Sequence, residues 1–231
     1  MCRHLAWLGA PRTLSSLITE PEYGLLRQSY APRQQRHGLL NADGWGVGFL
    51  DDTGTVRRWR SPRPLWNDAS FASIAPVLSS GCVLAAVRSA TVGMPPDETA
   101  AAPFTDGRWL FSHNGRVALD AVPTSSAAES IGDSAQLAAH IFDTGVEHLA
   151  ETLAKVAAAD PDARLTVLLT DGSRILGVAW DNELCYRQLP DGVVVASEPY
   201  DDERGWVSLA DHHMIEVSDA GIMITDLESA N

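Results

Sequence analysis

The hydrophobic positions of this chain fall into many short runs, most of them bounded by glycine, proline or other turn residues. Apolar and aromatic runs of this length are typical of β-strands. Thr53-Gly54 and Asp171-Gly172 each separate two such runs and predict hairpins, because glycine accepts the positive φ angles of tight turns. We expect the first strand to stop at Gly9. The predicted strands cover residues 2–9, 44–52, 55–61, 81–89, 108–115, 164–170, 173–180, 183–189, 192–198 and 212–218.

Two stretches with a helical period follow side chains that can cap a helix, Asn67 or Asp68 in the first case and Asp133 in the second. The first helix is expected to run to about Leu78, and the second, longer helix to break near Gly145. Hairpin-linked strands with helices in separate blocks predict the α+β class. Antiparallel sheets with helices packed outside them are the expected arrangement.

Composition narrows the function classes. The 231 residues are 45% hydrophobic, which is enough apolar material for a sizeable core. The formal net charge of −13 disfavours nucleic acids and anionic membranes as partners, because binding to either depends on basic side chains. No apolar run approaches the roughly 20 residues that span a bilayer, and no secretory signal is evident. We therefore expect one domain over residues 1–231 that acts on a small molecule.

The chain has three cysteines, Cys2, Cys82 and Cys185, and none of them forms a C-x-x-C pair. An odd number without paired spacing argues against a disulfide framework and favours the reducing cytoplasm. Cys82 and Cys185 lie in predicted strands, where packing in the core accounts for them. Cys2 differs from both because it directly follows the initiator methionine.

Removal of Met1 would leave Cys2 with a thiol and a free α-amine on one residue. The thiol has an ordinary pKa of about 8.5 and the amine one of about 7.7–8.0, so both titrate near neutrality. The amine can therefore serve as the base for the thiol, as it does for N-terminal threonine nucleophiles. Taken alone, a cysteine at position 2 is a weak signal, and an arbitrary second residue is the commoner explanation.

Four further stretches carry residues that suit amide chemistry. One has three glycines in an aromatic strand, where a backbone or ligand can approach closely. One places Arg88 at the end of a buried strand, and another places Asn114 and Gly115 in a turn after a strand. An asparagine amide and a glycine N–H can both point at one oxygen, as an oxyanion hole requires. These stretches are residues 41–49, 87–93, 111–117 and 132–141.

In this order behind Cys2, the stretches resemble the class II glutamine amidotransferase domain of the N-terminal nucleophile hydrolases. The family pattern has an initial cysteine, a Gly-Trp-Gly strand, Arg-x-Ala-Thr, Asn-Gly and an Asp-Ser helix start. All five features occur in this order here, and the last begins at Asp133. The resemblance implies a four-layer αββα sandwich of two antiparallel sheets. It also implies a hydrolase that acts on a γ-glutamyl amide bond.

The resemblance assigns a role to each matching residue. Cys2 would attack the γ-carbonyl of the glutamyl group and form a thioester. Asn114 and Gly115 would stabilise the oxyanion, where the loss of one donor can cost ~3–4 kcal/mol. Arg88 would bind the α-carboxylate through two parallel hydrogen bonds, and Asp133 would bind the α-ammonium.

Three further positions, Trp45, Gly46 and Thr91, are expected by the same resemblance to contact the substrate. The sequence departs from the family pattern in three places. Ala86 stands where a histidine is frequent, Gln136 replaces a common glutamate, and AAAPF keeps only Pro103 and Phe104 of a frequent Asn-x-His-Pro-Phe segment. None of these departures removes the nucleophile, the oxyanion hole or the glutamyl clamp.

No metal or organic cofactor is expected. The pairs Cys2-x-His4 and His212-His213 contain side chains that can bind metal, but no four-ligand spacing accompanies them. No phosphate-binding glycine motif occurs in the required strand–helix context.

Within the family, the compact length and the sequences MCRHLAWLG, LLNADGWGVGF and VRSATVG are most similar to the stand-alone γ-glutamyl amidohydrolases of ergothioneine biosynthesis. This branch releases glutamate from γ-glutamyl-hercynylcysteine sulfoxide, whose leaving group carries a trimethylammonium. Trp45, Trp66 and Phe104 are candidates for a cation–π contact with it. The alternatives are a glutaminase subunit that supplies ammonia to a separate synthase, and a non-catalytic γ-glutamyl-binding module. Homo-oligomerisation is left open.

Each assigned residue also has a purely structural interpretation. Arg88 could form a buried salt bridge, and Asp133 could serve only as a helix cap. Asn114 and Gly115 could form an ordinary turn. His113 could act as a papain-type base, although packing is the favoured explanation at a strand position beside this turn.

Overall fold

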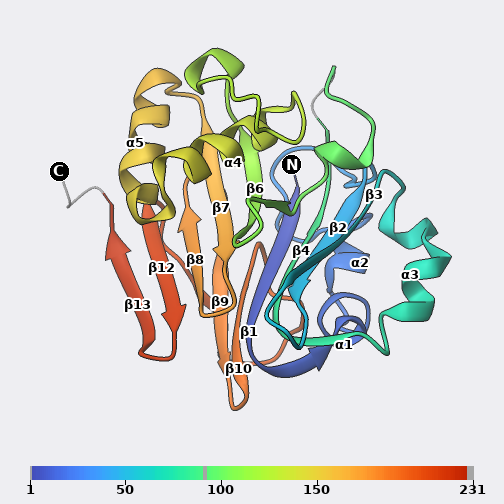
Figure 1. Cartoon of the computed structure of the whole chain (residues 1–231). Helices are drawn as coiled ribbons and strands as arrows, with labels where there is room; N and C mark the ends of the chain where they lie inside the picture. The colour runs from blue at the N-terminus through green and yellow to red at the C-terminus, as the bar shows by residue number, and fades with distance from the viewer. Residues whose placement is uncertain (1, 91–92, 228–231) are drawn as a thin grey trace.

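The computed structural model describes residues 2–90 and 93–227, which form two antiparallel sheets with helices on their outer sides (Figure 1). The larger sheet has the strand order β11-β9-β10-β1-β4-β2-β3, so β1 and β4 lie near its centre. Cys2 stands directly before β1. The strands of this sheet are β1 (Arg3–Thr13), β2 (Trp45–Leu50), β3 (Val56–Ser61), β4 (Ser79–Val87), β9 (Cys185–Leu189), β10 (Gly192–Ala196) and β11 (Val207–Ser208).

The smaller sheet has the order β13-β12-β8-β7-β6-β5. Its strands β6 and β7 pair in continuous antiparallel register from Leu110 opposite Thr170 to Arg116 opposite Arg164. Asn114 and Gly115 therefore lie within a regular ladder and not in a loop. The strands of this sheet are β5 (Phe104–Thr105), β6 (Leu110–Arg116), β7 (Arg164–Thr170), β8 (Arg174–Ala179), β12 (His213–Ser218) and β13 (Gly221–Asp226).

Helices cover the outer face of each sheet. In Figure 1, α4 and α5 lie over the smaller sheet, and α1, α2 and α3 lie beside the larger one. The α-helices are α1 (Leu14–Ile18), α2 (Leu25–Gln28), α3 (Ala69–Ile74), α4 (Asp133–Thr144) and α5 (Leu149–Ala159). Short 3₁₀ turns are η1 (Leu65–Asn67), η2 (Glu98–Ala100), η3 (Leu119–Ala121) and η4 (Val146–His148).

Three apolar clusters fill the three interfaces between these four layers, because both faces of each central strand are buried. In β1, Leu5 and Trp7 pack on the helix side of the larger sheet, whereas Ala6 faces the other sheet. In β6, Phe111 faces the helices and Leu110 faces the larger sheet. Alternate residues of a strand point to opposite faces. The αββα sandwich that the sequence predicts is therefore confirmed.

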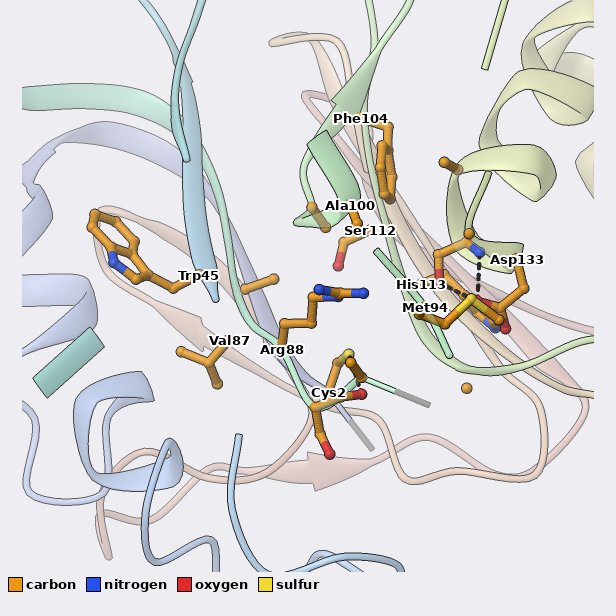
Figure 2. Close-up of a pocket in the computed structure, with 18 residues that line it drawn as sticks. Cys2, Trp45, Val87, Arg88, Met94, Ala100, Phe104, Ser112, His113 and Asp133 are labelled. Atoms are coloured by element: carbon orange, nitrogen blue, oxygen red, sulfur yellow. Dashed lines mark hydrogen bonds between the residues drawn. The ribbon is translucent and has the colours of Figure 1, made fainter. Parts of the chain in front are cut away.

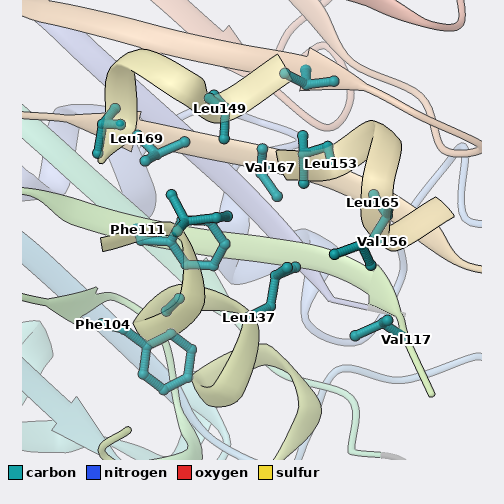
Figure 3. Close-up of a cluster of buried hydrophobic side chains, with 14 of the residues drawn as sticks. Phe104, Phe111, Val117, Leu137, Leu149, Leu153, Val156, Leu165, Val167 and Leu169 are labelled. Atoms are coloured by element: carbon teal, nitrogen blue, oxygen red, sulfur yellow. The ribbon is translucent and has the colours of Figure 1, made fainter. Parts of the chain in front are cut away.

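The interface between α4, α5 and the smaller sheet is drawn in Figure 3. Leu137 from α4 and Leu153 from α5 pack against Phe111 and Val167 of the sheet, and all four side chains are fully buried. Burying a side chain of this size stabilises the fold by roughly 1.5–3 kcal/mol. This contact holds the first turn of α4, which begins with Asp133, close to β6.

The first strand does not stop at Gly9 as predicted. β1 continues to Thr13 after a register shift between Leu8 and Arg12. A Cβ atom on Gly9 would lie 2.2 Å from the carbonyl oxygen of Asp191, so this glycine permits a close approach of two strands. The predicted strand end at Gly9 is therefore wrong. β13, the edge strand of the smaller sheet, was not predicted from the sequence.

Both predicted hairpins are present, as β2–β3 and β7–β8. Three residues connect β7 to β8, and among them Gly172 alone has a positive φ, of 90°, so the two-residue mirror-image turn is not formed. The predicted break in the long helix is confirmed, because Gly145 separates α4 from η4 with a φ of 91°.

The two predicted helix caps have different outcomes. Asp68 caps α3, since its Oδ1 accepts a hydrogen bond of 3.1 Å from the N–H of Phe71, although the helix ends at Ile74 instead of Leu78. Gly132 occupies the cap position of α4, and Asp133 is the first helical residue. Asp133 is therefore not the cap of this helix, which frees its carboxylate for other contacts.

Candidate active site

A pocket opens where the start of β1, the end of β4, β6 and the first turn of α4 meet. Its lining includes five of the residues that the sequence assigns to catalysis or substrate binding, Cys2, Trp45, Arg88, Gly115 and Asp133. Figure 2 shows Cys2 and Arg88 in the middle of the view and Asp133 beside His113 and Met94. Residues from four distant segments of the chain therefore meet at one site.

Cys2 is half-buried at the edge of this pocket, and its Sγ lies 3.9 Å from the carbonyl oxygen of Ser89. The β1–β4 ladder pairs Arg3 with Val87, so the next step of the same register brings Cys2 opposite Arg88. Burial raises the pKa of the Cys2 thiol, and the positive charge of Arg88 opposes that shift. The thiol is therefore protonated near neutrality and requires a base before it can act as a nucleophile.

Arg88 is 8% exposed and is held by carbonyl oxygens. Its Nη1 donates to the carbonyl of Asp43 at 3.2 Å and to that of Pro95 at 2.9 Å. No carboxylate of the described residues lies within ion-pair distance of its guanidinium, so the buried salt bridge does not account for it. The charge of Arg88 is thus fixed in place and remains available to an anionic group in the pocket.

Asp133 is also 8% exposed, and each of its carboxylate oxygens accepts one backbone hydrogen bond. Oδ2 accepts from the N–H of Val117 at 3.1 Å and Oδ1 from the N–H of Ser134 at 2.9 Å. Each oxygen can accept a further hydrogen bond. A buried, oriented carboxylate on one wall and a buried guanidinium on another give the pocket two opposite charges.

Gly115 lines the pocket, whereas Asn114 lies behind the lining and is fully buried. The Asn114 Nδ2 makes one long hydrogen bond of 3.4 Å to Ser197 Oγ, and its Oδ1 has no partner among the described residues. A Cβ atom on Gly115 would lie 1.8 Å from the carbonyl oxygen of Arg164, so any other residue there would displace β7. Asn114 keeps one amide hydrogen free to donate.

The family model for class II glutamine amidotransferases matches residues 26–190 of this chain. The chain belongs to this family. It is 58% identical to the γ-glutamyl-hercynylcysteine sulfoxide hydrolase of Mycolicibacterium smegmatis over 98% of this chain and 100% of that protein. Identity to the protein of the same name from Mycobacterium tuberculosis is 56% over 100% of this chain and 98% of that one.

Solved structures support the fold of this class II glutamine amidotransferase. A glutamine aminotransferase class-II domain protein from Silicibacter pomeroyi superposes with a TM-score of 0.71 at 22% identity, covering 98% of this chain and 99% of that one. The glutamine phosphoribosylpyrophosphate amidotransferase of B. subtilis gives a TM-score of 0.68 at 14% identity, covering 98% of this chain and 49% of that one. At these identities the likeness concerns the fold alone.

The remaining predicted contacts are placed differently in this amidotransferase. The Trp45 ring is directed away from Cys2 and Arg88 (Figure 2) and packs on Phe71 in the core, with ring centroids 4.4 Å apart. Gly46 does not line the pocket. A Cβ atom there would lie 2.3 Å from the carbonyl oxygen of Ala102, so this glycine allows the loop before β5 to approach. Thr91 lies outside the described residues, as does Met1.

Two of the three aromatic candidates for the leaving group, Phe104 and Trp45, line the pocket. Trp66 is 43% exposed and packs edge-on against Tyr30, with ring centroids 5.9 Å apart, outside the pocket lining. Trp45 also lines the pocket, but its ring points away from Cys2 and Arg88 (Figure 2). Phe104 is therefore the better placed of these two aromatic residues for a contact with the leaving group.

His113 lines the pocket with both ring nitrogens already bonded. Nδ1 lies 2.9 Å from Ser134 Oγ, and Nε2 lies 2.8 Å from the carbonyl oxygen of Arg164. Burial lowers the pKa of this imidazole. These contacts fit the structural role that the sequence analysis favoured over a papain-type base.

Four polar residues next to the site were not predicted to contribute to it. His4, Ser112 and Ser197 are fully buried, and His4 is hydrogen-bonded to both serines. The Nδ2 of Asn182 donates to the backbone oxygen of Asn114 at 2.8 Å. They come from β1, β6 and two loops. The signal that could have found two of them is strand alternation, which puts His4 on the face of Cys2 and Ser112 on that of Asn114.

In the part of the chain that the structure describes, no three or more histidine, cysteine or carboxylate side chains gather into a possible metal site. None of the described helices is long and apolar enough to cross a membrane.

Proposed function

We propose that this protein hydrolyses the γ-glutamyl amide bond of γ-glutamyl-hercynylcysteine sulfoxide in ergothioneine biosynthesis and releases glutamate. Two relatives with that printed name are 56–58% identical over essentially the whole chain, which supports the proposal. The pocket geometry supports it independently, because it combines a thiol with two fixed opposite charges. The proposal takes residues 1–231 as one domain.

The observation that carries this proposal is that Cys2 lines one pocket together with a buried guanidinium and a buried carboxylate. The glutamate end of a γ-glutamyl amide has an α-carboxylate and an α-ammonium on one carbon. Arg88 is suited to the first and Asp133 to the second. An α-linked peptide lacks this pair of free charges, so the pocket selects the γ-linkage.

The reaction begins after removal of Met1, which exposes the α-amine of Cys2. This amine takes the thiol proton, and the thiolate attacks the γ-carbonyl carbon to form a tetrahedral oxyanion. Asn114 Nδ2 and the Gly115 N–H donate to that oxyanion. The protonated amine then transfers its proton to the leaving nitrogen, the C–N bond breaks, and the amine product departs from a thioester. Water attacks the thioester with the amine again as base, and glutamate leaves as the thiol re-forms.

The leaving group of this substrate carries a trimethylammonium, and Phe104 is the pocket residue suited to it. A cation over an aromatic face gains ~0.5–2 kcal/mol. Free glutamine has no such group, so this contact would favour the betaine substrate over glutamine.

We further propose a cytoplasmic location and a small-molecule substrate as the main partner. The three cysteines form no disulfide. A thiol nucleophile must stay reduced to act, which fits a reducing compartment.

The direct test incubates the purified protein separately with γ-glutamyl-hercynylcysteine sulfoxide and with glutamine, and measures glutamate release. We expect a higher kcat/KM for the betaine substrate and no turnover by Cys2→Ala, which should still bind substrate. The matched control is Cys185→Ala, a buried thiol that is not part of the pocket lining, and it should stay active. Equal kcat/KM values would favour a glutaminase, and binding without turnover by the protein lacking Met1 would favour a binding module.

A further inference from the structure

Four side chains face one another across the gap between the two sheets, beneath the pocket. His4 is the second residue of β1, and Cys2, directly before the strand, is two positions from it; Ser112 and Asn114 are alternate residues of β6. Alternate residues in a strand share a face. Cys2 and His4 therefore point toward the smaller sheet, and Ser112 and Asn114 point toward the larger one.

One hydrogen bond crosses this gap directly. His4 Nδ1 lies 3.1 Å from Ser112 Oγ, and both side chains are 0% exposed. Ser112 also lines the pocket, and its hydroxyl is drawn above Arg88 in Figure 2. The other ring nitrogen of His4, Nε2, has no hydrogen-bond partner among the described residues. The imidazole thus uses one defined nitrogen to join the two sheets.

Ser197 provides further hydrogen bonds to two of these four residues, His4 and Asn114. The backbone N–H of His4 donates to Ser197 Oγ at 3.0 Å, and the N–H of Ser197 donates to the His4 carbonyl at 2.9 Å. The Nδ2 of Asn114 reaches the same Ser197 hydroxyl at 3.4 Å. The side chain proposed to stabilise the oxyanion is therefore tied to the strand that carries the proposed nucleophile.

The rest of this interface is mostly apolar. Ala6, Leu84, Leu110 and Leu168 pack between the sheets in contacts that have no preferred direction. A hydrogen bond does have a preferred direction and length, so it fixes the lateral position of one sheet on the other. Near the opposite end of the sheets, Cys82 Sγ and Thr170 Oγ1 form another bridge between the sheets, 3.2 Å long.

We propose that His4 and Ser112 are a positioning pair that sets the place of the Cys2 thiol relative to Asn114 and Gly115. The inference rests on the function proposed above. Neither residue is required to touch a reacting atom. Their effect is geometric, and a displacement of about 1 Å at a reacting centre can lower the rate by about 100-fold.

The imidazole of His4 remains neutral during the reaction. Burial, together with the positive charge of Arg3, lowers the pKa of His4 to about 3. A ring that is neutral at every working pH holds Ser112 without taking up or releasing a proton. Substitutions that alter this hydrogen bond should therefore change the height of the pH–rate profile and leave its shape unchanged.

The test compares two amide variants of His4. In His4→Asn the amide reaches the position of Nδ1, and in His4→Gln it reaches that of Nε2. We expect His4→Asn to keep kcat within about 5-fold of the wild type. We expect His4→Gln and Ser112→Ala to lose about 30-fold or more in kcat, with KM changed by less than about 3-fold. Thermal unfolding checks that all variants are folded.

The matched control is Cys82→Ala, which removes the bridge at the other end and should leave kcat near the wild-type value. Equal losses in both amide variants and in Cys82→Ala would mean general loosening of the sheets and would overturn the proposal. A rise in KM at constant kcat in Ser112→Ala would make Ser112 a substrate contact and would also overturn it. Full activity of His4→Gln and Ser112→Ala overturns the positioning pair alone. A wild-type protein that cleaves neither γ-glutamyl compound overturns the proposed function and the pair with it.

Discussion

Cys2 lies opposite Arg88 at the open end of the β1–β4 ladder, one register step beyond the pair of Arg3 and Val87. The guanidinium next to the thiol is buried and held by two backbone carbonyls, so its position is fixed before any substrate arrives. On the other wall, Asp133 is fixed by two backbone N–H groups. A thiol held near two fixed opposite charges suits a substrate that carries both an α-carboxylate and an α-ammonium better than it suits an uncharged substrate.

Arg88→Lys should lower kcat/KM for the γ-glutamyl substrate by roughly 10–100-fold, mostly through KM. Lysine keeps the charge but cannot form two parallel hydrogen bonds with a carboxylate. Steady-state kinetics measure the change, with Arg57→Lys as the control, because Arg57 is exposed and pairs with Asp51 away from the pocket lining. A fully active Arg88→Lys enzyme would contradict the assignment of Arg88 to the α-carboxylate.

Asp133→Asn should abolish the preference for substrates that carry an α-ammonium. The measurement compares a γ-glutamyl amide with the corresponding glutaryl amide, which lacks the amino group. The wild type should favour the former by roughly 10–100-fold, the value of one hydrogen bond between charged groups. In the variant the ratio should approach one. If the ratio persists in Asp133→Asn, another residue binds the ammonium.

Phe104→Leu should reduce discrimination between the betaine substrate and glutamine by roughly 2–30-fold, which corresponds to one cation–π contact. Leucine retains most of the apolar volume at this buried position, so the fold should survive. The readout is the ratio of the two kcat/KM values. Trp66→Leu is the control, since Trp66 lies outside the pocket lining and the ratio should not move. An unchanged ratio in Phe104→Leu would exclude the ring from leaving-group recognition.

Unfolding free energy should fall as the pH drops from about 6.5 toward 3, partly because of His4. Its pKa in the folded protein is lowered to about 3, so the unfolded chain binds a proton that the folded chain does not. The contribution of neutral His4 to the unfolding free energy is fully present above the ordinary histidine pKa. It is lost as the pH falls below that value, by at most about 1.36 kcal/mol per pH unit. His113 is shifted in the same direction. Urea titrations at several pH values, on the wild type and His4→Asn, separate the contribution of His4 from that of His113. If the unfolding free energy changed with pH equally in both proteins, a neutral buried His4 would be contradicted.

The strands and hairpins were predicted from the sequence because their signals are local, whereas the four-layer arrangement was implied by the family resemblance. The apolar runs of β4 and β7 and the glycines at the turns each specify a strand or hairpin without reference to distant residues. Gly9 shows the limit of such signals. Its neighbour Asp191 comes from a remote hairpin, and the sequence alone could not distinguish close strand approach from strand termination.

The charged residues of the site were predicted from the sequence, but most of the residues that support them were not. Cys2, Arg88 and Asp133 meet in one pocket as expected. Trp45 lines the pocket as well, but its ring packs on Phe71, a contact that the sequence did not indicate. The pairing of His4 with Ser112 joins two sheets, and no spacing rule along one chain predicts it.

Intact-mass spectrometry of the native protein, mixed briefly with γ-glutamyl-hercynylcysteine sulfoxide, tests the central claim most directly. The account predicts a chain without Met1 that gains one glutamyl group on Cys2 and loses it again as glutamate appears. A fully active protein that retains Met1, or one that turns over without any adduct on Cys2 under rapid quenching, would contradict it.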